Sequence, residues 1–208
     1  KQSMKSMFIL AMAISFARLS SAISDNTVLQ FLRNEIETDC LSRSRYIWPT
    51  AQRLIEYGIT NGMSTNTVVL LAHALIEEEY AAYRKLPEGQ REEQRRLYQR
   101  CHVLFGVLEY AHDPISLDFL DGLRQEKSDF QWYANYSYMR ILCTSDAAVI
   151  RRELADPEKA ARINLSALCT NMFWLGGTRH MKEQDLDERL LGFAEHLDKI
   201  QDLGILLS

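Results

Sequence analysis

Apolar residues recur every three to four positions along nearly the whole chain, which is the spacing of amphipathic α-helices. The pattern predicts helices over residues 3–22, 28–36, 48–58, 66–86, 90–112, 115–142, 147–154, 157–176 and 186–203. Residues 115–142 form either one helix or two that break near Gly122 or Ser128. No segment alternates apolar and polar residues between turn residues, as a half-buried strand does. We therefore expect an all-α protein with a single all-helical domain over residues 1–208.

The first predicted helix is apolar on all sides between Met7 and Ala17. Such a helix must be buried, either by a membrane or by other helices. The run is shorter than the roughly 20 apolar residues of a membrane span. Arg18 also interrupts it before the small residues that would imitate a signal-peptide cleavage site. We therefore predict a multi-helix bundle of about eight or nine helices around a buried N-terminal helix, which docks either on its own domain or on a partner.

Turn and capping residues separate the predicted helices. Ser64 or Thr65 is expected to cap the helix that follows the Gly58 loop. Asp146 and Asp156 are expected to cap the helices that follow them, the second with Pro157 in its first turn. The last helix is expected to bury a face of Leu186, Leu190, Phe193, Leu197 and Ile200.

Composition narrows the function classes only slightly. The chain has 208 residues and a net charge of −4, which argues mildly against binding to a nucleic-acid backbone. The cysteines do not form a metal-binding or redox motif, and we expect free buried thiols in a reducing compartment. They are Cys40, Cys101, Cys143 and Cys169.

The strongest candidate for chemistry is the pair Glu109 and His112. A glutamate and a histidine three residues apart share one helical face, and the pair resembles half of the metal site in di-iron carboxylate bundles. Glu78 stands where a partner glutamate of such a bundle would lie, but the second half of the ligand set is missing. His73 lies within an apolar stretch and is expected to be a hydrogen-bonded core residue, with Glu77 as a possible partner one turn later.

The densest aromatic group lies between residues 130 and 139. Phe130 and Tyr133 are placed to face the core, which leaves Trp132 and Tyr138 toward another surface, while each remains open to a core role. Aromatic residues are enriched at the centres of protein interfaces. We therefore predict a protein interface that uses Trp132, Tyr136, Tyr138 and Trp174.

The hypothesis that follows is a non-enzymatic, chaperone-like helical adaptor in the cytoplasm. It would bind other protein subunits within a larger assembly, without a cofactor and without nucleic acid. A secretion-system adaptor is one form that such a subunit could take. The alternative is a metal-dependent helical enzyme of the di-metal carboxylate type that uses Glu78, Glu109 and His112.

Overall fold

The computed structural model describes residues 27–42, 48–87, 89–126, 128, 130–163, 171 and 183–196. These residues contain nine helices and no strand, which confirms the all-α prediction. The helices are α2 (Thr27–Ser42), α3 (Trp48–Thr60), α4 (Thr65–Lys85), α5 (Arg91–Ala111), α6 (Ser116–Arg124), α7 (Gln131–Thr144), α8 (Ala147–Ala155), α9 (Pro157–Ala161) and α11 (Glu183–Ala194). The predicted buried N-terminal helix lies outside the described residues, so it stays a prediction, as does a single domain over the whole chain.

Short polar side chains start the helices where the sequence predicted them. The Ser64 hydroxyl accepts a hydrogen bond from the backbone N–H of Thr67 at the start of α4. Asp146 accepts one from Val149 at the start of α8, and Asp156 accepts one from Glu158 at the start of α9. These bonds satisfy amide groups that the first turn of a helix leaves without an intrahelical partner.

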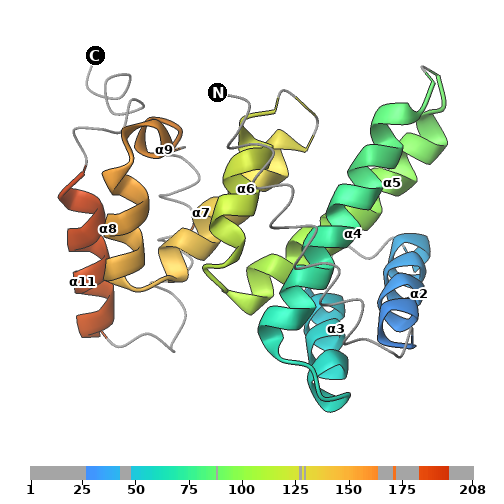
Figure 1. Cartoon of the computed structure of the whole chain (residues 1–208), viewed down its shortest axis with the longest axis horizontal. Helices are drawn as coiled ribbons and strands as arrows, with labels where there is room; N and C mark the ends of the chain where they lie inside the picture. Colours follow the sequence, from blue (N-terminus) through green and yellow to red (C-terminus); the bar gives the residue numbers. More distant parts are fainter. Residues whose placement is uncertain are drawn as a thin grey trace, which may run out of the picture.

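The helices are arranged around a long antiparallel pair, α4 and α5 (Figure 1). Helices α2 and α3 pack against this pair on one side, and α6 and α7 pack against it on the other. Helix α7 lies between α6 and α8, and α9 and α11 both pack against α8 (Figure 1). None of the helices in the described ranges is both long enough and apolar enough to cross a membrane.

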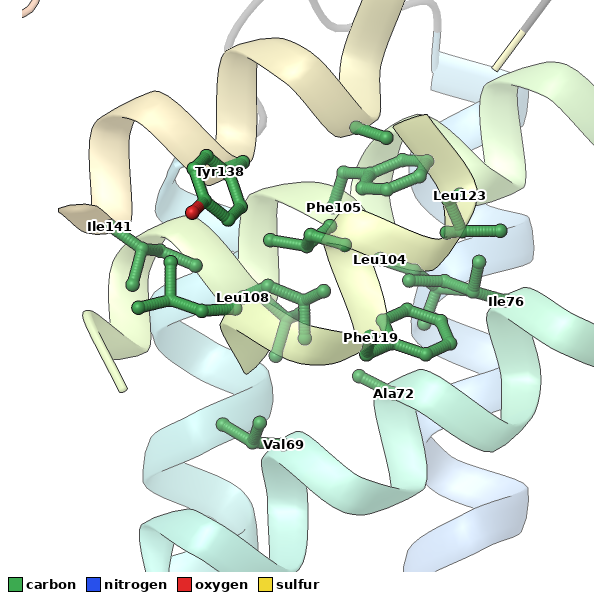
Figure 2. Close-up of a cluster of buried hydrophobic side chains, with 14 of the residues drawn as sticks. Val69, Ala72, Ile76, Leu104, Phe105, Leu108, Phe119, Leu123, Tyr138 and Ile141 are labelled. Carbon is green, nitrogen blue, oxygen red and sulfur yellow. The ribbon is translucent and has the colours of Figure 1, made fainter. Parts of the chain in front are cut away.

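The core is one continuous cluster of buried apolar side chains that extends from α2 to α11. Figure 2 shows part of this cluster, to which four helices contribute: Ile76 from α4, Leu104 and Phe105 from α5, Phe119 from α6 and Ile141 from α7. Close helix packing also requires a glycine in α3, because a Cβ atom on Gly58 would overlap a methyl group of Val68 in α4.

Three helix predictions were wrong in their extent: the helix predicted over residues 28–36 continues to Ser42 as α2, and two later helices end sooner than expected. The helix that starts at Pro157 was expected to reach residue 176 but ends at Ala161. Just beyond this end, the backbone carbonyl of Arg162 accepts a hydrogen bond of 2.7 Å from the Arg124 guanidinium. Gln131 caps the carbonyl of Arg124 in the same way, at 2.9 Å, where the chain breaks between α6 and α7.

The last helix was also predicted too far along the chain, since α11 ends at Ala194. Phe193 is buried as expected, but Leu190 is 45% exposed, so the predicted face is wrong at that position. Leu197 and Ile200 lie outside the described residues. Among the described helices, α11 packs mainly against α8, and Arg189 of α11 also donates a hydrogen bond to the backbone carbonyl of Cys143 in α7.

Candidate functional site

The first turn of α7 presents an aromatic surface to solvent. Trp132 is 64% exposed, more than any other large apolar side chain that the structure describes. Its indole stacks on the half-buried Tyr136 one turn later, with ring centroids 5.6 Å apart and an angle of 14° between the planes. This stacking limits the motion of the indole, so Trp132 offers a preformed apolar contact.

A chain of touching rings leads from Trp132 into the body of the protein. The Trp132 ring meets the edge of Tyr133 at 5.0 Å, and Tyr133 meets Tyr98 of α5 at 5.1 Å. Phe130 is 1% exposed and contacts Tyr98 and Tyr83, at 5.6 Å and 5.0 Å. The predicted core positions of Phe130 and Tyr133 are therefore confirmed, fully for Phe130 and in part for Tyr133, which is half-buried.

An open groove of about 430 Å³ lies at the tip of the α4–α5 pair. Its lining consists of Tyr83 from α4 and Arg91, Gln94, Arg95 and Tyr98 from α5. This groove was not predicted from the sequence. A signal was present, because the short turn at Pro87 places the last turn of α4 beside the first turns of α5. The many charged residues between Arg84 and Arg100, however, favoured a solvated helix surface over a groove with two tyrosines.

Tyr138 is wrong as a predicted interface residue, because its side chain is fully buried. Its ring lies beneath the Arg124 guanidinium, with 3.9 Å from the guanidinium carbon to the ring centroid. Its hydroxyl donates a hydrogen bond of 3.2 Å to Glu153 of α8. Burial raises the pKa of this hydroxyl well above its ordinary value. Trp174, the fourth predicted interface residue, lies outside the described residues.

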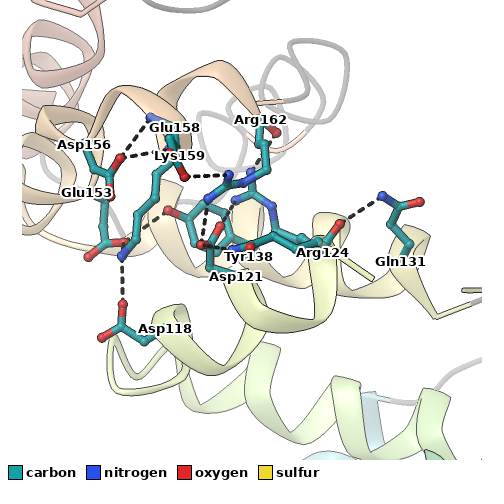
Figure 3. Close-up of polar contacts among 11 residues, drawn as sticks. Asp118, Asp121, Arg124, Gln131, Tyr138, Glu153, Asp156, Glu158, Lys159 and Arg162 are labelled. Carbon is teal, nitrogen blue, oxygen red and sulfur yellow. Dashed lines mark hydrogen bonds and ion pairs between the residues drawn. The ribbon is translucent and has the colours of Figure 1, made fainter. Parts of the chain in front are cut away.

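Tyr138 belongs to a polar network that joins α6, α7, α8 and α9 (Figure 3). Arg124 of α6 is 2% exposed, and its guanidinium lies 3.7 Å from Asp121. Arg162 donates a hydrogen bond of 2.9 Å to the same Asp121 carboxylate. This half of the network holds two cations around one buried acid.

The other half of the network surrounds Glu153, which is 3% exposed. Lys159 donates hydrogen bonds to Glu153 and to Asp118, at 2.8 Å and 2.7 Å, and thereby links α8 and α9 to α6. Arg152 donates two further bonds to the second oxygen of Glu153. Since each of these charges faces an opposite charge, the network fits a structural role that fixes how the helices meet.

The three residues of the metal-enzyme alternative point to different neighbours. Glu78 is exposed and makes a bidentate ion pair with Arg33 of α2, at 3.1 Å and 2.7 Å. Glu109 is buried and accepts a hydrogen bond of 2.7 Å from Ser137 of α7. His112 follows the end of α5 in a left-handed backbone conformation. Within the described part of the chain, no three histidine, cysteine, aspartate or glutamate residues are placed to hold a metal ion.

His73 is a hydrogen-bonded core residue, as predicted, but with a different partner from Glu77. A hydrogen bond of 2.9 Å joins its Nε2 to the hydroxyl of Ser116 in α6, and its ring stacks on Phe119 at 4.2 Å. Burial lowers the pKa of His73 to about 4. The imidazole is therefore neutral at physiological pH and contributes packing and one hydrogen bond rather than charge.

Because His73 is buried, the stability of the folded protein should depend on pH. His73→Gln should make that dependence weaker. In the unfolded chain, His73 has its ordinary pKa of about 6.5 and binds a proton as the pH falls, whereas the folded protein resists that proton down to about pH 4. The stabilising contribution is complete above pH 6.5 and is lost toward pH 4, so about 2 kcal/mol should disappear between pH 7.5 and pH 5.

Urea unfolding of the wild type and the variant at both pH values measures this difference. His112, whose pKa is also lowered to about 4 by desolvation and by Arg140 and Arg189, is present in both proteins and cancels in the comparison. Equal pH dependence in the two proteins would contradict the assignment to His73.

Two of the four thiols fall within the described side chains. Cys101 and Cys143 are buried thiols that form no disulfide, as predicted for a chain without a disulfide framework. The side chains of Cys40 and Cys169 lie outside the description, so the prediction for them stays open.

Comparison with known proteins identifies no family or function for this chain. No family model matches the chain, and no curated protein or solved structure is significantly similar to it.

Proposed function

We propose that this protein is a non-enzymatic helical adaptor, located in the cytoplasm, that binds other proteins within a larger assembly. The observation that carries the proposal is the exposed Trp132, held by Tyr136 at the start of α7. We call this pair, together with the adjoining Tyr133, the aromatic surface.

The energetics of exposure support this proposal. A tryptophan side chain left in water forgoes the favourable free energy of burying its large apolar area. Binding a partner would recover that free energy. Because Trp132 already stacks on Tyr136 and touches Tyr133, little conformational entropy is lost when a partner covers it. Tryptophan is also among the residues most enriched at the energetic centres of interfaces.

Trp132→Ala should therefore weaken capture of a specific partner while the fold stays intact. Truncation of an interface tryptophan costs about 1–2 kcal/mol or more, which corresponds to about a 5- to 30-fold loss of affinity. The wild type and the variant are used as baits in the native source, and mass spectrometry quantifies the partners that each retains. Affinity for the recovered partner is then measured with purified proteins.

Ile59→Ala is the matched control. Ile59 is also a large apolar residue and is 50% exposed, but it lies on α3 outside the aromatic surface. The control should retain the same partners as the wild type. Equal loss with both variants, or no loss with Trp132→Ala, would contradict the proposed role of the aromatic surface.

Elemental analysis of the purified protein tests the non-enzymatic part of the proposal against its alternative. A stoichiometric metal that is lost in His112→Ala would overturn the adaptor hypothesis in favour of a metal enzyme.

A further inference from the structure

We propose that the groove between α4 and α5 binds an acidic, extended segment of the partner protein, with an aromatic or proline side chain between Tyr83 and Tyr98. This inference rests on the proposed adaptor function and specifies the chemistry of the partner. The carboxylates of the segment would pair with Arg91 and Arg95. Guanidinium groups suit this role because they bind carboxylates through two parallel hydrogen bonds.

The charges around the groove are the first argument. Three nearby arginines already have glutamate partners: Arg84 pairs with Glu126, Arg96 with Glu92 and Arg100 with Glu79. Arg91 and Arg95, by contrast, make no ion pair with any described carboxylate, although both line the groove.

The described acidic residues nearby have other partners and leave this positive charge in place. Glu93, on the same helix, forms a long ion pair of 3.9 Å with Arg100. Glu92 forms an ion pair with Arg96. Glu126 accepts a hydrogen bond from Tyr80 as well as pairing with Arg84. The groove therefore carries two arginines available to a negatively charged ligand, in a protein whose net charge is −4.

The walls of the groove are the second argument. Both tyrosines contact the buried Phe130, which fixes them in place. Rigid aromatic walls bind proline or aromatic side chains with little loss of entropy. Gln94, which also lines the groove, carries an amide that can both donate to and accept from a peptide backbone.

Continuity with the aromatic surface is the third argument. Tyr98 lines the groove and touches Tyr133, which in turn touches Trp132. One extended segment can therefore place its acidic part against the two arginines and a following apolar residue on Trp132. A nucleic acid is disfavoured by the net negative charge and by the small number of available cations.

Charge reversal at the groove tests this inference. The full chain is titrated with fluorescein-labelled peptides that carry a central proline and tyrosine flanked by glutamates, by lysines or by serines. The glutamate peptide should bind the wild type most tightly, and its affinity should fall as sodium chloride is added. Arg91→Glu combined with Arg95→Glu should weaken that binding at least about tenfold and improve binding of the lysine peptide.

A control variant changes the net charge by the same amount, but at two arginines outside the groove. Arg53→Glu combined with Arg151→Glu alters two exposed ion pairs on α3 and α8, which contribute little to stability. This variant should bind the glutamate peptide like the wild type. Circular dichroism of both variants confirms that the helices are retained.

Three results would overturn the inference: equal affinity for the three peptides, equal loss in both double variants, or tighter binding of a single-stranded oligonucleotide than of the glutamate peptide.

Capture of the natural partner separates failure of this inference from failure of the adaptor function. If Trp132→Ala weakens partner capture and the groove variant does not, the adaptor function is supported and the proposed binding of an acidic segment is contradicted. If neither variant weakens capture, both proposals fail.

Discussion

Tyr138→Ala should lower the free energy of unfolding by about 4 kcal/mol, within the range found when buried aromatic side chains are truncated. The Tyr138 side chain is fully buried, its ring supports the Arg124 guanidinium, and its hydroxyl donates to Glu153. Alanine would leave a cavity and remove the cation–π contact. It would also remove one donor from a buried carboxylate.

Two further variants separate the parts of this effect in urea unfolding. Tyr138→Phe keeps the ring and should cost only about 1 kcal/mol, because Arg152 and Lys159 still bind Glu153. Trp132→Ala should stay within about 0.5 kcal/mol of the wild type, as is usual for exposed positions. A Tyr138→Ala protein as stable as the Trp132→Ala protein would show that the ring is not part of the core.

Asp121→Ala should be nearly as damaging, with a loss of about 3–5 kcal/mol. Asp121 is the acid that faces both Arg124 and Arg162, and Arg124 is almost fully buried. Without this carboxylate, two guanidiniums would face each other in a region of low dielectric constant. The cost comes mainly from the uncompensated charge left behind, rather than from the loss of a favourable contact.

A double variant tests this explanation. Arg124→Met combined with Asp121→Ala removes both buried charges and keeps an apolar side chain above Tyr138. Arg162 has 29% of its side chain exposed and can turn its charge toward water. The double variant should therefore recover much of the stability that Asp121→Ala alone loses. Losses that simply add would contradict coupling between the two charges.

Helix starts could be predicted from the sequence because they depend on local chemistry. Ser64, Asp146 and Asp156 cap their helices through atoms only two or three residues away. Helix ends were less predictable. Helix α9 ends where Arg124, 38 residues earlier in the chain, binds the carbonyl of Arg162. A capping side chain so distant in sequence leaves no local pattern to read.

The candidate site was likewise predictable only in part from the sequence. Sequence spacing gave Trp132 and Tyr138 a common surface, but the first is 64% exposed and the second fully buried. Spacing sets the angle of a side chain around a helix, whereas burial also depends on where neighbours lie along the axis. Trp132 lies in the first turn of α7, whereas Tyr138 lies farther along the same helix, beside Arg124 of α6 and Glu153 of α8 (Figure 3).

The periodicity of apolar residues by itself determined that the described chain is helical, because a buried stripe at a spacing of three to four residues is satisfied only by a helix. It also indicated that Phe130 faces the core. The tertiary structure alone decided that Arg124 is buried over Tyr138 and that Tyr83 and Tyr98 form two walls of one groove. These contacts join residues from different helices, and their formation depends on how the helices pack rather than on any pattern within one of them.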